Sequence, residues 1–153
     1  HLSIRRQRQM CIRDSYTLGQ RGGIGIGGLK GVAEGAWFVL HKDIENNRLV
    51  IGQGHEHPLM QSTTLWSETI DWVAGEMQIP ETGFRCTSRT RYRQDDQDCV
   101  IFNDPTTPGG VRVEFDEPQR AVTPGQSVVF YSGEVCLGGG VIHHTNAPKP
   151  DFI

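Results

Sequence analysis

The stretch from Phe84 to Arg93 is the part of the sequence best suited to chemistry, because it is rich in arginine. It reads Phe-Arg-Cys-Thr-Ser-Arg-Thr-Arg-Tyr-Arg and predicts a β-strand, in which alternate residues face opposite sides. One face would then carry Arg85, Thr87, Arg89, Arg91 and Arg93. Guanidinium groups form bidentate hydrogen bonds with phosphate oxygens, so four arginines on one face indicate a nucleic-acid-binding surface.

Tyr92 lies at the end of the same predicted strand, where its ring could stack on an unpaired base. The opposing interpretation is a solvated strand face whose arginines pair with nearby acids. Those acids are Asp95, Asp96 and Asp98. The formal net charge of −3 does not favour nucleic-acid binding in general, so any cationic surface must be local.

A glycine-rich segment contains the pattern G-x-G-x-x-G at Gly23, Gly25 and Gly28. A dinucleotide-binding fingerprint requires a strand before this pattern and a helix after it. Residues 29–35 hold two more glycines, which disfavour a helix. We therefore expect a sharp loop, and treat a nucleotide site as the minor alternative.

Histidines and cysteines are the remaining candidates for metal binding or nucleophilic catalysis. His55 and His57 are two residues apart without an evident third ligand, and the pair His143-His144 has the same weakness, so we expect no metal site. Cys86, Cys99 and Cys136 fall inside predicted strands, where cysteine usually packs as a small apolar residue. None of the four cysteines forms a Cys-x-x-Cys pair, and reduced thiols in the cytosol are the default expectation.

Short β-prone runs separated by glycine and proline turns predict a mainly β protein. A hairpin is expected from residues 37–40 and 48–51, with Glu45-Asn46-Asn47 as its turn. Further strands are expected at 70–73, 84–93, 99–102, 111–115, 127–131, 134–137 and 141–143. No apolar run approaches the roughly 18 residues of a membrane helix, and no secretory signal is visible.

The chain divides into four predicted parts. Residues 1–15 differ in character from the rest and are predicted to be a non-native or disordered leader, although a basic RNA-touching arm is the alternative. Residues 16–60 are expected to form part of a central β-roll domain, and residues 61–145 a closed β-barrel. Residues 146–153 would be a tail.

Several segments together closely resemble the tRNA-specific 2-thiouridylase family, over roughly residues 16–142 and in family order. The segments are Tyr16–Arg21 with the following glycine loop, Lys42-Asp43, Glu45–Asn47, Gly52–His55, Thr90–Gln94, Phe115–Pro118, Ala121–Ser127, Tyr131 and Gly133–Gly140. The resemblance implies an SH3-like β-roll followed by a barrel like those of translation factors. The departures are a changed lead into Tyr16, Gly22 where the family usually has a basic residue, and a variable loop at 103–110.

The resemblance also implies a function. Family members thiolate C2 of the wobble uridine of certain tRNAs, using ATP with Mg and persulfide sulfur from a sulfur-relay donor protein. The phosphate loop and the catalytic cysteines of the family are expected upstream of Tyr16. This chain is accordingly expected to be a C-terminal fragment that contains no catalytic residue and no cofactor site, binds tRNA in the cytoplasm and has no membrane partner.

The resemblance further assigns tRNA contacts. The dipeptide that touches tRNA in the family's barrel matches Arg91-Tyr92, and a single contact in the closing turn matches Gln126. Arg85, Arg89 and Arg93 are added as weaker candidates from the arginine pattern alone. The competing hypotheses are a stand-alone β-barrel that binds RNA or protein without catalysis, and a nucleotide or metal enzyme built on the glycine loop or on His55 and His57.

Overall fold

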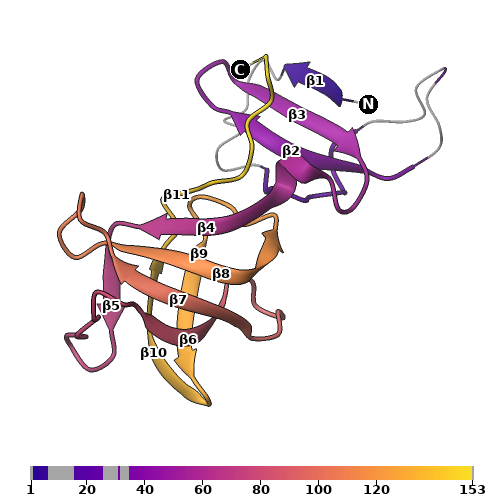
Figure 1. The fold of residues 1–153 in the computed structure, drawn as a ribbon. Helices are drawn as coiled ribbons and strands as arrows, with labels where there is room; N and C mark the ends of the chain where they lie inside the picture. Colours follow the sequence, from indigo (N-terminus) through magenta and orange to yellow (C-terminus); the bar gives the residue numbers. More distant parts are fainter. Residues whose placement is uncertain (1, 7–15, 26–30, 32–34, 153) are drawn as a thin grey trace. The chain divides into compact units, whose positions relative to one another are not determined.

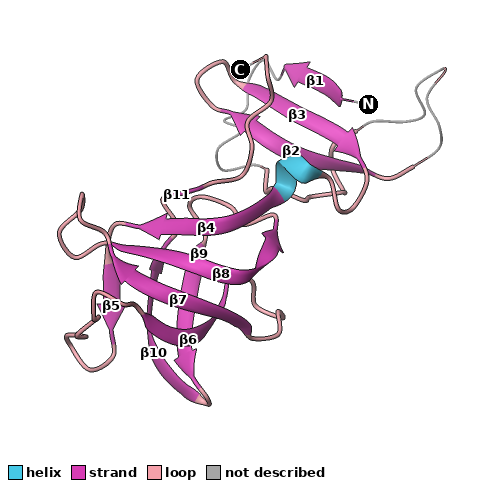
Figure 2. Ribbon diagram, in the orientation of Figure 1, coloured by secondary structure: helices cyan, strands magenta, loops and turns pink. Residues whose placement is uncertain are grey.

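The computed structural model describes residues 2–6, 16–25, 31 and 35–152. The chain forms two compact units, His1–Gln61 with Ala147–Ile153 and Ser62–Asn146, and each is treated separately below. Strands dominate both units, and one short 3-10 helix is the only helix among the residues that the structure describes (Figure 2). The prediction of a mainly β protein is therefore confirmed. No helix in the described part of the chain has the length and apolar character to cross a membrane.

The first unit is a three-stranded antiparallel sheet with the order β1-β3-β2. Its elements are β1 (Leu2–Arg6), β2 (Trp37–Asp43), β3 (Arg48–Gln53) and the 3-10 helix η1 (Pro58–Met60). Apolar side chains of β2 and β3 form its core with Tyr16 and Ile24. The predicted hairpin is confirmed, and β1 adds a strand inside the segment predicted to be a leader. Residues 7–15 lie outside the described part, so the origin of that leader stays a prediction.

The β2–β3 turn is held by a buried carboxylate. Asp43 is only 4% exposed, and it accepts hydrogen bonds from the backbone and side-chain amides of Asn46 and from the guanidinium of Arg48. Burial alone would raise the pKa of Asp43, but the hydrogen bonds from Arg48 and Asn46 outweigh burial and hold the pKa below its ordinary value. The carboxylate therefore stays ionised and ties the turn to the start of β3.

The second unit is an eight-stranded sheet with the order β11-β4-β8-β7-β6-β9-β10-β5. Its strands are β4 (Gln61–Ser67), β5 (Ile70–Trp72), β6 (Phe84–Arg89), β7 (Gln97–Asn103), β8 (Val111–Arg120), β9 (Ser127–Ser132), β10 (Val135–Val141) and β11 (His144–Thr145). The sheet curls so that β9 and β10 run across the back of β6 and β7 (Figure 1). Alternate side chains along each strand point into one apolar core, which includes Ile101, Val113 and Phe130.

A run of glycines in β10 lets this strand lie very close to its neighbours. A Cβ atom would lie 2.4 Å from the Asp71 carbonyl oxygen at Gly138, and 2.3 Å from the Thr69 carbonyl oxygen at Gly140. The ladder to β9 also shifts register between Cys136 and Gly138, which marks a β-bulge. Side chains larger than hydrogen are thus excluded where β10 packs between β5 and β9.

Three strand predictions were wrong in their boundaries. The strand predicted at 84–93 ends at Arg89, because the chain turns from Thr90 onward. The strand predicted at 134–137 extends to Val141 as β10, whereas residues 142–143 of the strand predicted at 141–143 lie outside any strand. The sequence reading also missed β4, whose polar composition gave no strand signal.

Candidate nucleic-acid interface

The arginines on β6 are neutralised by acids. Arg85 forms an ion pair with Asp116 at 2.8 Å, and Arg89 forms one with Asp96 at 2.6 Å while lying over the ring of Tyr131. Each carboxylate raises the pKa of its arginine, chiefly through the hydrogen bond. The predicted stripe of four free arginines on one strand is therefore wrong. The alternative with acidic partners holds for Arg85 and Arg89, although Asp116 was not among the acids foreseen.

Residues 91–94 form a β-turn just after β6. The backbone amide of Gln94 donates to the carbonyl of Arg91 at 3.3 Å, which leaves Tyr92 and Arg93 at the two central positions. Tyr92 is 94% exposed, the largest exposure among the large apolar side chains that the structure describes. Arg93 is exposed as well. The strand therefore ends in a turn that presents an aromatic ring beside a cation.

Arg91 ties this turn to the connection between β8 and β9. Its Nη2 donates to the carbonyl oxygens of Arg120 at 3.0 Å and Ala121 at 3.2 Å. Partial burial of the guanidinium, and secondly the nearby charge of Arg120, lower the pKa of Arg91. Two guanidinium groups are thus held near one another, an arrangement that an anion would stabilise.

Gln126 lies at the same end of the sheet as this turn. The backbone ladder pairs Arg89 with Val129, so residues just after β6 lie near residues just before β9. Thr123 to Gln126 form a second β-turn, with Gly125 at a φ of 91° and the Gln126 amide donating to the Thr123 carbonyl at 3.1 Å. This geometry is that of a type II turn, for which Pro124-Gly125 is the favoured pair. Arg91, Tyr92, Arg93 and Gln126 therefore come from two neighbouring turns.

Glutamine side chains behind the turn are the residues that the sequence reading missed. Gln94, Gln119 and Gln97 form a chain of side-chain hydrogen bonds that connects the turn to the end of β8 and the start of β7. Gln119 is only 4% exposed. The signal for them in the sequence was the segment Thr90–Gln94, in which Gln94 directly follows the arginine-rich run.

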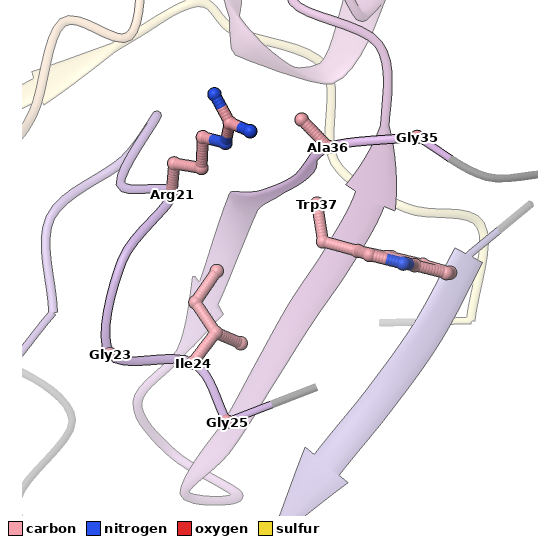
Figure 3. A pocket seen from close by; sticks show the side chains of 7 residues that line it. All are labelled: Arg21, Gly23, Ile24, Gly25, Gly35, Ala36 and Trp37. Atoms are coloured by element: carbon pink, nitrogen blue, oxygen red, sulfur yellow. The ribbon is translucent and has the colours of Figure 1, made fainter. Parts of the chain in front are cut away.

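The glycine loop lines a pocket in the first unit, with a volume of about 440 Å³. Figure 3 shows Arg21 and Trp37 on its wall together with backbone from Gly23–Gly25 and Gly35. Residues 16–22, which lead directly into Gly23, contain no strand, so the strand that a dinucleotide fingerprint needs immediately before its first glycine is absent there. Gly28 lies outside the described residues. Among the lining residues that the structure describes, a single cation beside an indole ring and glycine backbone offers no group for acid–base or nucleophilic chemistry.

The histidines singled out in the sequence each contact neighbouring groups of the protein. His55 Nδ1 lies 2.6 Å from a Glu56 carboxylate oxygen, and His57 Nδ1 accepts from the Leu59 amide at the start of η1. His144 stacks on Trp66 with 4.4 Å between ring centres. In the part of the chain that the structure describes, no three or more His, Cys, Asp or Glu residues are grouped so as to hold a metal ion.

Two cysteines lie opposite one another in the barrel core. Cys86 and Cys99 are register partners on β6 and β7, and their sulfur atoms are 3.8 Å apart. The hydrogen bond to Cys99, together with burial, raises the pKa of the Cys86 thiol, so it is protonated at neutral pH. Cys136 is exposed, which corrects the prediction that it packs inside. Cys11 lies outside the described residues.

Two family models match the chain. Residues 62–142 match a model described as an aminomethyltransferase beta-barrel domain, and residues 14–53 match one described as a tRNA methyl transferase PRC-barrel domain. The class is therefore that of proteins with a PRC-barrel domain followed by this β-barrel domain, in agreement with the two β units of the structure.

Curated relatives narrow this class. A tRNA-specific 2-thiouridylase MnmA of Acinetobacter baylyi is 80% identical over 138 residues, which cover 90% of this chain and 37% of the relative. The protein of that name from Acinetobacter baumannii strain SDF is 78% identical over the same shares, and that from Psychrobacter sp. strain PRwf-1 is 59% identical over 83% of this chain and 33% of the relative. The chain belongs to the tRNA-specific 2-thiouridylase family and spans little more than a third of these relatives' length.

Proposed function

We propose that this chain holds tRNA for a tRNA 2-thiouridylase, through Arg91, Tyr92 and Gln126. The observation that carries the proposal is the exposure of Tyr92 at a turn whose neighbours are cationic. An aromatic ring left in water at 94% exposure gains nothing for the fold, whereas stacking on an unpaired base contributes about 1–3 kcal/mol. The anticodon loop of a tRNA supplies such unpaired bases, and sequence-specific recognition of RNA commonly uses them.

Ion pairs within the chain limit how many phosphates this surface can bind. Arg85 and Arg89 already have carboxylate partners, so their contribution is expected to be small. Arg91 uses only Nη2 for its two carbonyl bonds, which leaves Nε and Nη1 for a phosphate. With Arg93 this gives two phosphate contacts, and the logarithm of the binding constant should fall with the logarithm of salt concentration at a slope of about −1.4 to −1.8.

The reaction itself is assigned to residues outside this chain. The relatives are named for tRNA-specific 2-thiouridylation. We infer that the whole protein thiolates C2 of the wobble uridine in the cytoplasm with ATP, Mg and persulfide sulfur from a donor protein. Support comes from Cys86, which is buried and whose pKa is raised, because a protonated thiol inside the core is a poor nucleophile. This chain would then supply binding and no catalytic group.

Tyr92→Ala tests the proposal directly. Binding of this chain to unmodified tRNA with a wobble uridine, followed by fluorescence anisotropy at low salt, should weaken about 10-fold, since that factor corresponds to about 1.4 kcal/mol of lost stacking. Tyr92→Phe is the matched control and should bind like the original chain, because stacking needs the ring and not the hydroxyl.

Arg112→Ala provides a second control at a distant place. Arg112 lies eight residues before Arg120 on β8, roughly 26 Å along the strand, and pairs with Glu114. Its removal should leave tRNA affinity within twofold. Unchanged affinity in Tyr92→Ala, or equal losses in Tyr92→Ala and Arg112→Ala, would contradict a tRNA contact at this turn.

A further inference from the structure

We infer that Gln94 and Gln119 are positioning residues, which fix the turn that presents Tyr92 and Arg93 to RNA. This inference rests on the proposed function and adds the device that orders its contact. The two glutamines come from the end of the turn and from β8, and they meet behind the exposed side chains with 3.1 Å between the Gln94 amide nitrogen and the Gln119 amide oxygen.

The direction of every hydrogen bond in this network is fixed by backbone groups. The Thr90 amide is a donor only, so the atom it meets at 2.9 Å is the Gln94 carbonyl oxygen, which also accepts from the Thr90 hydroxyl. The Glu117 carbonyl is an acceptor only, so the Gln119 group 3.0 Å from it is the NH₂. Gln119 donates its other hydrogen to Gln97 at 3.0 Å. Each glutamine thus has one amide orientation that satisfies all its neighbours.

Burial makes the network rigid. Thr90 is 7% exposed and Gln119 is 4% exposed, so water cannot readily replace a lost partner. A buried donor or acceptor without a partner costs about 1–3 kcal/mol, which penalises any movement that pulls Gln94 away. The turn therefore has one favoured position relative to β8.

The turn is held on both sides of its tip. Gln94 fixes the side after Arg93, and Arg91 fixes the side before Tyr92 through the carbonyls of Arg120 and Ala121. Ala121 adopts a φ of 54°, and its carbonyl also accepts from the Thr123 hydroxyl at 3.1 Å. Left-handed backbone at a residue other than glycine costs about 1–2 kcal/mol, which the surrounding contacts must offset. Two fixed ends leave Tyr92 and Arg93 ordered before RNA arrives, so binding loses less conformational entropy.

The neutrality of the network matters for an anionic ligand. Carboxylates in these positions could accept from Thr90 but could not donate to Gln97 or to the Glu117 carbonyl, and they would place negative charge beneath a phosphate-binding surface. Amides supply both the donors and the acceptors of the network, without a counter-charge for Arg91 or Arg93. A glutamine chain is therefore the arrangement that orders the turn and still leaves its cations available.

A double-mutant cycle with tRNA separates positioning from general stability. Gln94→Met keeps the side-chain length and the charge but removes the hydrogen bonds, and should weaken tRNA binding about fivefold. In a Tyr92→Ala background the same change should weaken binding less than twofold, because only Arg93 is then left to be positioned and the stacking ring is already absent. Gln61→Met is the matched control, since Gln61 and its hydrogen-bond partner Glu56 both belong to the first unit, outside this network.

The outcomes are distinct for the two proposals. If Tyr92→Ala binds like the original chain, the proposed tRNA contact fails. If Tyr92→Ala weakens binding but Gln94→Met does not, or weakens it equally in both backgrounds, the positioning role is overturned. A measurement on the unaltered chain guards against misfolded variants: slow hydrogen exchange of the Thr90 amide is expected, and exchange as fast as in an open loop would overturn the network.

Discussion

Two hairpin turns of this chain are held by opposite kinds of chemistry. The turn between β2 and β3 is fixed by the buried carboxylate of Asp43, which takes up the charge of Arg48. The turn after β6 is fixed by the neutral amides of Gln94 and Gln119, while Arg91 bonds only to carbonyl oxygens. The first arrangement uses its arginine for the fold alone. The second orders the backbone and leaves cations beside an exposed ring, which suits an anionic partner.

Among the variants that test this difference between the two turns, Asp43→Ala should have the largest effect. Removing the carboxylate leaves Arg48 and two donors of Asn46 without their partner, so the free energy of unfolding of the first unit should fall by about 3 kcal/mol. Hydrogen exchange of β2 and β3 amides measures it. Glu45→Ala in the same turn, where the side chain is exposed, should change it by less than about 0.5 kcal/mol.

Low pH should remove the stabilisation by the Asp43 carboxylate from the unaltered chain. The pKa of Asp43 is lower in the folded state than in the unfolded state, so its stabilisation is complete above the unfolded value of about 3.9. The stabilisation is then lost as pH falls through the lower folded value. Asp43→Asn should abolish this part of the acid dependence, and a parallel loss of stability in both chains below pH 4 would count against it.

Gln119→Met should cost the second unit about 2 kcal/mol, because Gln97, Gln94 and the Glu117 carbonyl lose a buried partner. Thermal unfolding of the barrel is the measurement. Gln126→Met should have the opposite pattern: it should leave the stability of the second unit unchanged and weaken tRNA binding. A stability loss of equal size in both variants would remove the distinction between a positioning and a contacting glutamine.

The smallest effect is expected from variants that remove the acidic partner of one arginine. Asp96→Asn releases Arg89, so tRNA affinity should rise about threefold and the salt slope should steepen by about 0.7–0.9. Asp116→Asn releases Arg85, four residues and roughly 13 Å further from the turn along β6, and should have less effect. Equal gains from both would show that nearness to the turn does not matter.

Much of the local structure could be predicted from residue pattern. The alternation in β6 put Cys86 and Ser88 inside and Arg85, Thr87 and Arg89 outside, as the strand shows. The hairpin of β2 and β3 followed from β-prone runs around Asn46-Asn47, and the Pro124-Gly125 turn followed from its preferred dihedral angles. These features depend on neighbours a few residues apart, which the sequence displays directly.

The pairing of charges could not be predicted in the same way. Arg85 lies 31 positions from Asp116 in the chain, and the carbonyls that bind Arg91 lie 29 and 30 positions away. Gln119 met Gln94 only because β8 continues past the residue where its apolar pattern stops. Long-range contacts of this kind follow from strand order, and strand order is a property of the whole sheet.

By itself the sequence determined the family and the β character, because residue identity and short-range periodicity are enough for these. Only the tertiary structure decided which arginines are already neutralised and which residues hold the turn. The physical reason is that a guanidinium is available to a ligand only if no nearer acid has bound it, and distance between side chains is set by how the barrel closes.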